Sequence, residues 1–312
     1  MYWSIGSKTF FLGEYYVLSS GKGLIAATEK RFSLKAEPSD LWEIVGLPEN
    51  SPADRLLRDG QQAMEQPFKL QFIDPYQGAG GLGASTAQFA LLFAFLKNRQ
   101  TSPFVFREAS SELLKVYRSY VGASKGVSPS GADLIGQWYG GLTAVDTQST
   151  QCDTLRWTFD HLDFLIVKTG NKLATHIHLE SLKKSDFQIF ESAYNMALMG
   201  LIEGDREEFV EGVSKYRALL ESEGLTDQKT RELLKKWDEC QLTLAHKGCG
   251  AMGVDTLVLF FDPVRFEEVL NQCQKMQLAV VGSSKDITSG ICTDNECLQN
   301  TPIQDVESGV TL

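Results

Sequence analysis

The N-terminal part of the chain alternates between apolar and polar positions with the period of a β-strand. Residues 8–18 (KTFFLGEYYVL) are rich in aromatic and β-branched side chains and are interrupted at Gly13-Glu14, so they predict a strand, a tight turn and a second strand. Residues 24–38 continue the alternation and predict another strand with one buried face. Residues 69–74 (KLQFID) add a short strand. Together these segments predict an antiparallel β opening.

Two helical segments follow in the first half of the chain. Residues 84–98 are apolar on nearly every side, so they predict a helix that is buried within the protein. Residues 110–122 predict a second helix behind a pair of serines that can cap it. A loop of serine, glycine and proline (124–133) comes next. Residues 134–146 then predict a helix or strand start, a glycine turn and a strand.

The pattern changes near residues 150–160, where we place a domain boundary. Beyond it, short apolar runs that predict buried strands are mixed with longer segments that predict helices. The predicted strands are 163–170, 256–261 and 277–283, and the predicted helices lie near 185–202, 205–222, 226–245 and 263–276. A second glycine-rich loop, KGCGAMGVD, occupies residues 247–255. The tail from Thr293 is polar and acidic, which predicts loose order.

Composition and charge narrow the possible functions. The 312 residues suffice for about two domains, and contents of 43% hydrophobic and 22% charged residues are typical of a soluble globular protein. The net charge of −10 argues against nucleic acid or an anionic membrane as the main partner, although a local basic pocket could still take an anionic small molecule. The first residues lack a signal-peptide pattern, and no uncharged apolar run reaches the length of a membrane span, roughly 18 residues. We therefore expect a cytoplasmic protein.

The six cysteines contain no CxxC pair, and we expect most of them to be reduced and structural. His176 and His178 form an HxH pair, and Cys292 and Cys297 lie five positions apart. Neither pair belongs to a four-ligand spacing, so the sequence does not favour a zinc site.

The stretch GAGGLGASTA at residues 78–87 carries the first candidate chemistry. Glycines let phosphate oxygens approach backbone N–H groups without a clash, and a helix N-terminus adds unsatisfied N–H groups and a positive dipole end. Ser85 and Thr86 could cap the helix, or a hydroxyl could hold nucleotide-bound Mg²⁺. A tight strand-to-helix connection would need fewer than four glycines, so the loop favours phosphate binding.

A dinucleotide-binding site is a competing interpretation of the same loop. Gly78, Gly80 and Gly83 match G-x-G-x-x-G, and an acid, Glu108, ends the next apolar run. Such a unit usually begins near the first strand of its domain, whereas a long β-rich stretch precedes the loop here. A Walker A motif is absent.

Four segments in order resemble the motifs of the GHMP small-molecule kinases. Gly6-Ser7-Lys8 and Gly13-Glu14-Tyr15 stand where that family has Pro-Gly-Lys and Gly-Glu-His or Gly-Glu-Tyr. The segment from Gly81 to Ala87 resembles the second motif, Ser128 to Asp133 the Pro-Ser-Gly-x-Asp segment, and Lys247 to Asp255 the third motif. Any one match is weak, but the ordered set with family-like separations is specific.

The chain departs from these motifs at several positions. Gln77 replaces a usual proline, Ala84 replaces the first serine of the second motif, and Met252 and Val254 replace glycines in the third. The position at which the family often carries a glutamate ligand for the metal is Gly122 here. A protein carboxylate on the metal is therefore in doubt from the motif alone.

The resemblance implies an α/β (α+β) fold with two domains. Residues 1–155 would form the ATP-binding domain with a mixed sheet of the ribosomal-protein type, and residues 156–312 a ferredoxin-like domain. The nucleotide would lie in the cleft between them.

The resemblance also implies roles for individual residues. ATP would lie against Gly80, Gly81, Leu82, Gly83, Ala84, Ser85 and Thr86, with Ser85 as the Mg²⁺ ligand. Asp133 would be the general base, since a carboxylate beside the acceptor oxygen can take its proton. Lys8 would favour the ionised form of Asp133. The acceptor would contact Glu14, Tyr15, Ser130, Gly131, Gly250 and Ala251.

The function implied by the resemblance is phosphoryl transfer from ATP, with Mg²⁺, to a small-molecule alcohol. The residues of the motifs are most similar to those of phosphomevalonate kinases, so 5-phosphomevalonate is the first expected acceptor. Mevalonate, or a sugar or homoserine-like alcohol, is the alternative acceptor. A catalytically silent relative that binds nucleotide or metabolite, and an NAD-type dehydrogenase, are alternatives of other classes. No nucleic-acid or membrane partner is expected, and the chain would be a monomer or homodimer.

Overall fold

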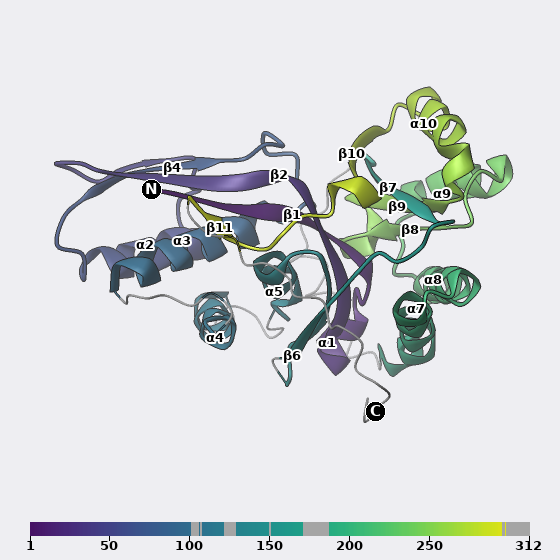
Figure 1. Ribbon diagram of the computed structural model, residues 1–312, viewed down its shortest axis with the longest axis horizontal. Helices are drawn as coiled ribbons and strands as arrows, with labels where there is room; N and C mark the ends of the chain where they lie inside the picture. Colours follow the sequence, from purple (N-terminus) through teal and green to yellow (C-terminus); the bar gives the residue numbers. More distant parts are fainter. Residues whose placement is uncertain are drawn as a thin grey trace.

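The structure is a computed structural model that describes residues 1–100, 106, 108–121, 129–149, 151–170, 187–294 and 297. The chain forms two β-sheets that lie side by side along the long axis of the molecule, each with its own helices (Figure 1). Among the described residues, no helix combines the length and the apolar character needed to cross a lipid bilayer.

In the described part of the chain, the first sheet has seven strands, of which β3 and β4 form the only parallel pair. The strands are β1 (Tyr2–Leu12), β2 (Lys22–Pro38), β3 (Glu43–Val45), β4 (Phe68–Ile73), β5 (Leu142–Asp146), β6 (Gln151–Leu155) and β11 (Cys292–Thr293). Their order is β11-β1-β2-β4-β3, while β5 pairs with the first residues of β2 and with β6. The long strand β2 thus joins both parts of the sheet, and the predicted antiparallel β opening is confirmed.

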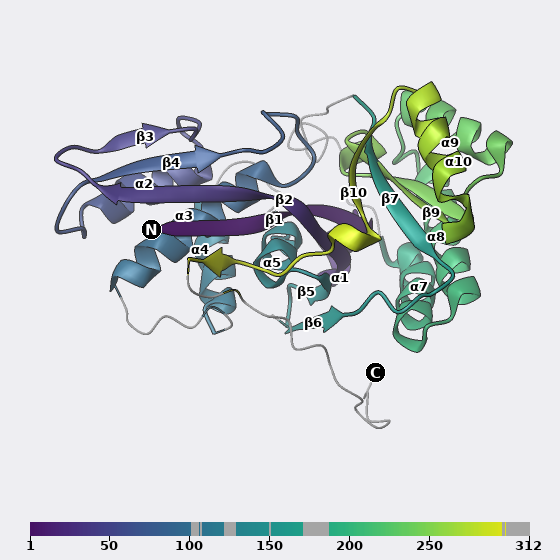
Figure 2. The ribbon, with the colours of Figure 1, turned by 45° about the horizontal axis from the view of Figure 1, so that its top comes forward.

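Helices cover this sheet and carry two of the candidate motifs. They are α2 (Pro52–Gln61), α3 (Ala84–Gln100), α4 (Ser110–Val121) and α5 (Ala132–Tyr139). Helix α3 lies under β1, β2 and β4 (Figures 1 and 2), and its residues from Phe89 to Leu96 are all buried. The prediction of a buried helix after the first glycine loop is therefore confirmed.

The predicted strand at the end of residues 8–18 is wrong. The chain forms a short helix there, α1 (Tyr16–Ser20), directly after the glycine turn. Gly13 has a φ of 106° and Tyr15 a φ of 66°, and the N–H of Val17 donates to the carbonyl of Gly13. These left-handed residues reverse the chain too sharply for a hairpin partner, so apolar alternation alone could not identify the helix.

The second sheet is antiparallel with the order β10-β7-β9-β8. Its strands are β7 (Asp163–Lys168), β8 (Ala245–Cys249), β9 (Thr256–Phe261) and β10 (Ala279–Ser283). Its helices are α7 (Glu191–Glu203), α8 (Arg206–Ser222), α9 (Gln228–Cys240) and α10 (Phe266–Lys275), with short 3₁₀ turns at 187–190, 251–253, 263–265 and 284–286. The polar sequence of β8 gave no strand signal, and this strand was missed.

The two faces of the second sheet have different partners. Leu165, Leu257 and Leu259 pack against α9 and α10. On the opposite face, Phe164 and Phe260 pack with α7, α8 and the end of β1, where the Phe11 ring lies 4.9 Å from that of Phe164. The end of β1 and the adjoining turn therefore lie between the sheets, and this turn carries the Gly-Glu-Tyr motif.

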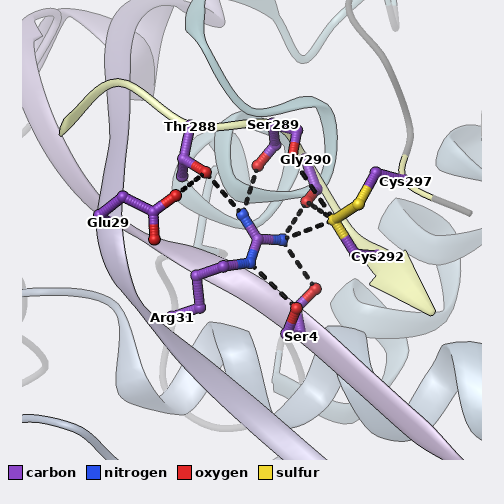
Figure 3. The surroundings of a disulfide bond; sticks show 8 residues. All are labelled: Ser4, Glu29, Arg31, Thr288, Ser289, Gly290, Cys292 and Cys297. Carbon is purple, nitrogen blue, oxygen red and sulfur yellow. Dashed lines mark hydrogen bonds between the residues drawn. A yellow bond between two sulfur atoms is a disulfide. The ribbon is translucent and has the colours of Figure 1, made fainter. Parts of the chain in front are cut away.

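Arg31 of β2 fastens the C-terminal segment to the first sheet (Figure 3). Its guanidinium donates hydrogen bonds to Ser4, to Thr288 at 3.0 Å and to the carbonyl of Ser289 at 2.9 Å. The guanidinium also contacts the sulfur of Cys292, which forms a disulfide with Cys297. The other four cysteines are free, in line with the expectation that most are reduced.

Candidate active site

The first glycine loop is held by side chains on either side of it. Asp74 accepts hydrogen bonds from the N–H groups of Tyr76 and Gly78, each at 2.8 Å, which shapes the turn after β4. The Tyr76 hydroxyl lies 3.0 Å from the Ser7 hydroxyl of the first motif. The carbonyl of Leu82 accepts a 3.0 Å hydrogen bond from the N–H of Lys8. The loop is therefore fixed to the middle of β1, at Lys8.

The glycines are needed for backbone conformation as well as for space. Gly81 and Gly83 both have a φ of 89°, in the left-handed region that side chains disfavour. A β-carbon at Gly83 would come within 2.7 Å of Lys8 Cγ and 2.8 Å of Gln137 Nε2. Backbone N–H groups at this turn can thus come close to a ligand, next to the start of α3.

Gln137 of α5 joins the loop to the first motif and was not found from the sequence. Its side chain is fully buried, its Nε2 donates to the carbonyl of Gly6 at 2.8 Å, and its Oε1 accepts from Thr86 at 2.6 Å. Thr86 also donates to the carbonyl of Gly83. Thr86 is therefore occupied by structural contacts, whereas Ser85 one position earlier is exposed.

Lys8 and Asp133 lie together, as the resemblance implies. Lys8 Nζ is 3.9 Å from Asp133 Oδ2, with side-chain exposures of 12% and 29%. Asp133 lies in the first turn of α5, where the helix dipole favours a negative charge, after Gly131 with a φ of 77°. The ammonium group also lies 5.1 Å from the centre of the Phe10 ring. A carboxylate therefore lies beside a cation, and the side chain that carries the cation packs against Gly83 of the glycine loop.

The segment that carries Asp133 is fastened by Arg118. This residue of α4 donates to the carbonyls of Ser130 at 2.8 Å and Thr147 at 3.2 Å. Tyr117, one position earlier, is buried, and burial, with a smaller effect of the Asp133 charge, raises the pKa of its hydroxyl. Ser128 and Gly122 lie outside the described residues.

The Gly-Glu-Tyr turn packs against the second glycine-rich loop, residues 247–255, through a buried ion pair. Lys247 Nζ of β8 lies 2.6 Å from Glu14 Oε1, with side-chain exposures of 0% and 7%. Glu14 Oε2 is buried without a hydrogen-bond partner. Burial lowers the pKa of Lys247, but neighbouring Cys249 and Glu14 outweigh that effect, so the pKa is raised and the ammonium form is retained.

Tyr15 makes a second contact between the Gly-Glu-Tyr turn and the second glycine-rich loop. Its hydroxyl accepts a 2.8 Å hydrogen bond from the N–H of Met252, and burial is the main reason that the pKa of Tyr15 is raised to about 12. Gly250 has a φ of 88° and Gly253 a φ of 66°. Met252 keeps a left-handed φ of 55° although it replaces a glycine of the motif. A left-handed backbone at position 252 is the conformation that glycine adopts most easily.

Two cations near the site were not identified from the sequence. Lys247 begins the third motif, but nothing in the sequence marks it as buried, because a buried lysine has the same sequence signature as a surface one. Lys168 lies at the end of β7, and its ammonium group is 5.8 Å from the centre of the Tyr76 ring. Tyr76 lies just before the first glycine loop. A charge from the second sheet thus lies beside a loop of the first.

The available ligands are compatible with Mg²⁺. Within the described part of the chain, no group of three or more histidine, cysteine, aspartate or glutamate residues forms a protein-only metal site. Mg²⁺ usually binds one or two carboxylates together with substrate phosphates and water, so it does not need such a group. The exposed Ser85 hydroxyl is a hard oxygen donor of the required kind.

Comparison with known proteins places this geometry in a recognised fold. Neither the sequence models of protein families nor individual curated sequences match the chain. Solved structures do match. Mevalonate kinase of Methanococcus jannaschii is 14% identical, with a TM-score of 0.73 over 93% of this chain and 98% of that one. Streptococcus pneumoniae phosphomevalonate kinase, in complex with phosphomevalonate and AMPPNP, is 17% identical, with a TM-score of 0.73 over 91% and 99%.

Similarity extends to a kinase that acts on a different acceptor. Lactococcus lactis galactokinase, in complex with galactose, is 12% identical, with a TM-score of 0.72 over 93% of this chain and 94% of that one. The chain therefore has the fold of the GHMP small-molecule kinases, and the fold predicted from the four motifs is confirmed. A largely antiparallel first sheet is not that of a dinucleotide-binding domain, so the competing interpretation of the glycine loop is not supported.

Proposed function

We propose that this protein is an ATP- and Mg²⁺-dependent kinase that phosphorylates a hydroxyl group of a small molecule. The observation that carries the proposal is the Lys8–Asp133 pair, 3.9 Å apart, at the mouth of a glycine loop that opens a buried helix. Phosphoryl transfer needs in-line positioning and positive charge more than covalent chemistry, and these residues supply both. The shared fold with several small-molecule kinases supports the same reaction class.

In the proposed reaction, the acceptor hydroxyl attacks the γ-phosphorus while its proton passes to the Asp133 carboxylate. The bond between the γ-phosphorus and the bridging oxygen breaks, and ADP leaves with that oxygen. Lys8, 3.9 Å from Asp133, would offset negative charge on the transferring group. Residues 80–86 would hold the phosphates, chiefly through backbone N–H groups, with the Ser85 hydroxyl toward the metal. Bound Mg²⁺ would neutralise phosphate charge.

The acceptor would lie between Asp133 and the second glycine-rich loop, residues 247–255. Ser130 and Gly131 flank the base, and Gly250 and Ala251 would turn backbone N–H groups toward the ligand. Glu14 and Tyr15 would act by shaping this wall, because one is paired with Lys247 and the other with the backbone of Met252. Residues 1–155 would form one domain and most of residues 156–312 the other, each contributing one side of the site, while β11 returns to the first sheet.

We favour 5-phosphomevalonate as the acceptor, from the wording of the motifs and the similarity to a phosphomevalonate kinase structure. Mevalonate, galactose and homoserine are the competing acceptors. A coupled assay of ADP formation at fixed ATP and Mg²⁺ with these four compounds tests the choice. Acceptor-dependent ADP formation with 5-phosphomevalonate alone supports it. Turnover of another compound would keep the reaction class but change the substrate, and nucleotide binding without any turnover would favour a non-catalytic relative.

A further inference from the structure

Lys168 is a cation of the second sheet on the face that packs against the first sheet. It is the last residue of β7 and shares a strand face with Phe164 and Ile166, because alternate residues of a strand point to the same side. That face packs against the end of β1, where the Phe11 ring lies 4.9 Å from that of Phe164. Lys168 is partly buried, and its ammonium group lies 5.8 Å from the centre of the Tyr76 ring. The charge therefore reaches the first sheet just before the first glycine loop.

The backbone next to Lys168 is held close to that loop. The N–H of Thr169 donates to the carbonyl of Asp255 at 3.4 Å. A β-carbon added at Gly81 would lie 2.3 Å from the β-carbon of Asp255. Tyr76 precedes the loop and Gly81 lies within it. The end of β7 therefore lies beside the loop that we propose to hold the nucleotide phosphates.

Lys168 has no carboxylate partner among the residues that the structure describes. None of them forms an ion pair within 4.0 Å of its ammonium group or a hydrogen bond with it. Burial is the main reason that the pKa of the Tyr76 hydroxyl is raised, and the nearby carboxylates of Asp286, Asp74 and Glu29 add to the rise. Each of these carboxylates accepts a hydrogen bond from another group. The ammonium group thus meets an aromatic face and keeps N–H donors for a ligand.

A phosphate oxygen is the ligand that fits this cation. Lysine binds phosphate as a point charge with three rotatable donors, and an anionic ligand offsets the cost of a partly buried charge. Lys8, the cation of the first motif, lies 3.9 Å from Asp133 and shares its charge with that carboxylate. We propose that Lys168 binds the phosphates of the nucleotide, so that the ligand is held by residues of both sheets. This inference rests on the proposed function and adds a phosphate contact outside the four motifs.

Calorimetric titration with a non-hydrolysable ATP analogue tests the proposal on Lys168→Met and Lys168→Arg. We expect the affinity of Lys168→Met to fall about 10- to 100-fold, as for a lost hydrogen bond to a charged group, and that of Lys168→Arg to stay within about threefold of wild type. The loss in Lys168→Met should shrink at about 1 M salt, where the screening length is about 3 Å. Lys285→Met is the matched control and should leave the affinity unchanged. The Lys285 ammonium group also lies 5.8 Å from an aromatic centre, that of Phe266, which packs on the other face of the second sheet.

Three results would overturn the inference. The first is an affinity of Lys168→Met within twofold of wild type, and the second is an equal loss of affinity in Lys168→Arg. The third is a loss in Lys168→Met that is the same at low and high salt, which would indicate packing against Tyr76 rather than charge. Thermal unfolding of each variant checks that it is folded. Failure of the proposed function is recognised separately, because the wild-type protein itself would then bind no analogue, and the inference would fail with it.

Discussion

Replacing Lys247 with methionine should destabilise the protein strongly, because it leaves the Glu14 carboxylate buried without a counter-charge. The two charged atoms lie 2.6 Å apart at exposures of 0% and 7%. At an effective dielectric constant of about 20, their attraction is about 6 kcal/mol, while desolvation costs several kcal/mol for each ion. The intact pair therefore contributes little net stability, but removing one partner should cost about 3–5 kcal/mol.

Urea unfolding of wild type, Lys247→Met, Glu14→Gln and the double variant measures this effect. The double variant removes both charges, so it should be at least about 2 kcal/mol more stable than Lys247→Met. Lys215→Met is the matched control, since Lys215 pairs with Glu211 at 2.8 Å on an exposed helix face, and it should cost less than about 1 kcal/mol. Two results would refute the reasoning. One is a free energy of unfolding for Lys247→Met within about 1 kcal/mol of the wild-type value, and the other is a double variant that is no more stable than Lys247→Met.

Two further predictions concern the nucleotide loop and pH. Gly83→Ala should lower ATP-analogue affinity about tenfold or more, because the new β-carbon meets Lys8 and Gln137 as well as a positive φ. Gly78→Ala has a similar φ but open space, so calorimetric titration should show a smaller loss there; equal losses would contradict the overlap argument. Burial, followed by nearby Arg217, lowers the pKa of His246 to about 4. The unfolded chain binds this proton near pH 6.5, so stability should be complete above that pH and fall by about 2 kcal/mol between pH 7 and 5. Denaturation at both pH values would show a smaller fall in His246→Gln, and an unchanged fall would exclude His246 as the cause.

The sequence predicted the fold where the pattern and the packing agree. Alternation identified β1, β2 and β4 of the first sheet, and continuous apolarity identified α3 as buried, because side-chain burial follows the period of the element. The short strands β3, β6 and β11 were not predicted. Helix α1 was missed because left-handed Tyr15 breaks the chain within an apolar run that looks like a strand. Strand β8 was missed because its sequence is polar, yet Lys247 and His246 are both buried in it.

The same limit applies to the candidate site. The ordered motifs identified Lys8, Asp133 and the first glycine loop as candidate site residues. In the structure these residues lie close together. Gln137 could not be identified in this way, because its contacts join segments far apart along the chain. A buried amide or carboxylate looks like a surface one until the fold is known.

The central claim is that Asp133 accepts the proton of the hydroxyl group that the nucleotide at the glycine loop phosphorylates. Acceptor-dependent ADP formation by wild type and Asp133→Asn, with ATP-analogue affinity measured on the same samples, tests it most directly. We expect kcat to fall about 10²- to 10⁴-fold, as is typical for the loss of a general base, while analogue affinity stays within about threefold. Two results would contradict the claim. One is an Asp133→Asn enzyme that turns over at the wild-type rate, and the other is a wild-type protein that forms no acceptor-dependent ADP with 5-phosphomevalonate, mevalonate, galactose or homoserine.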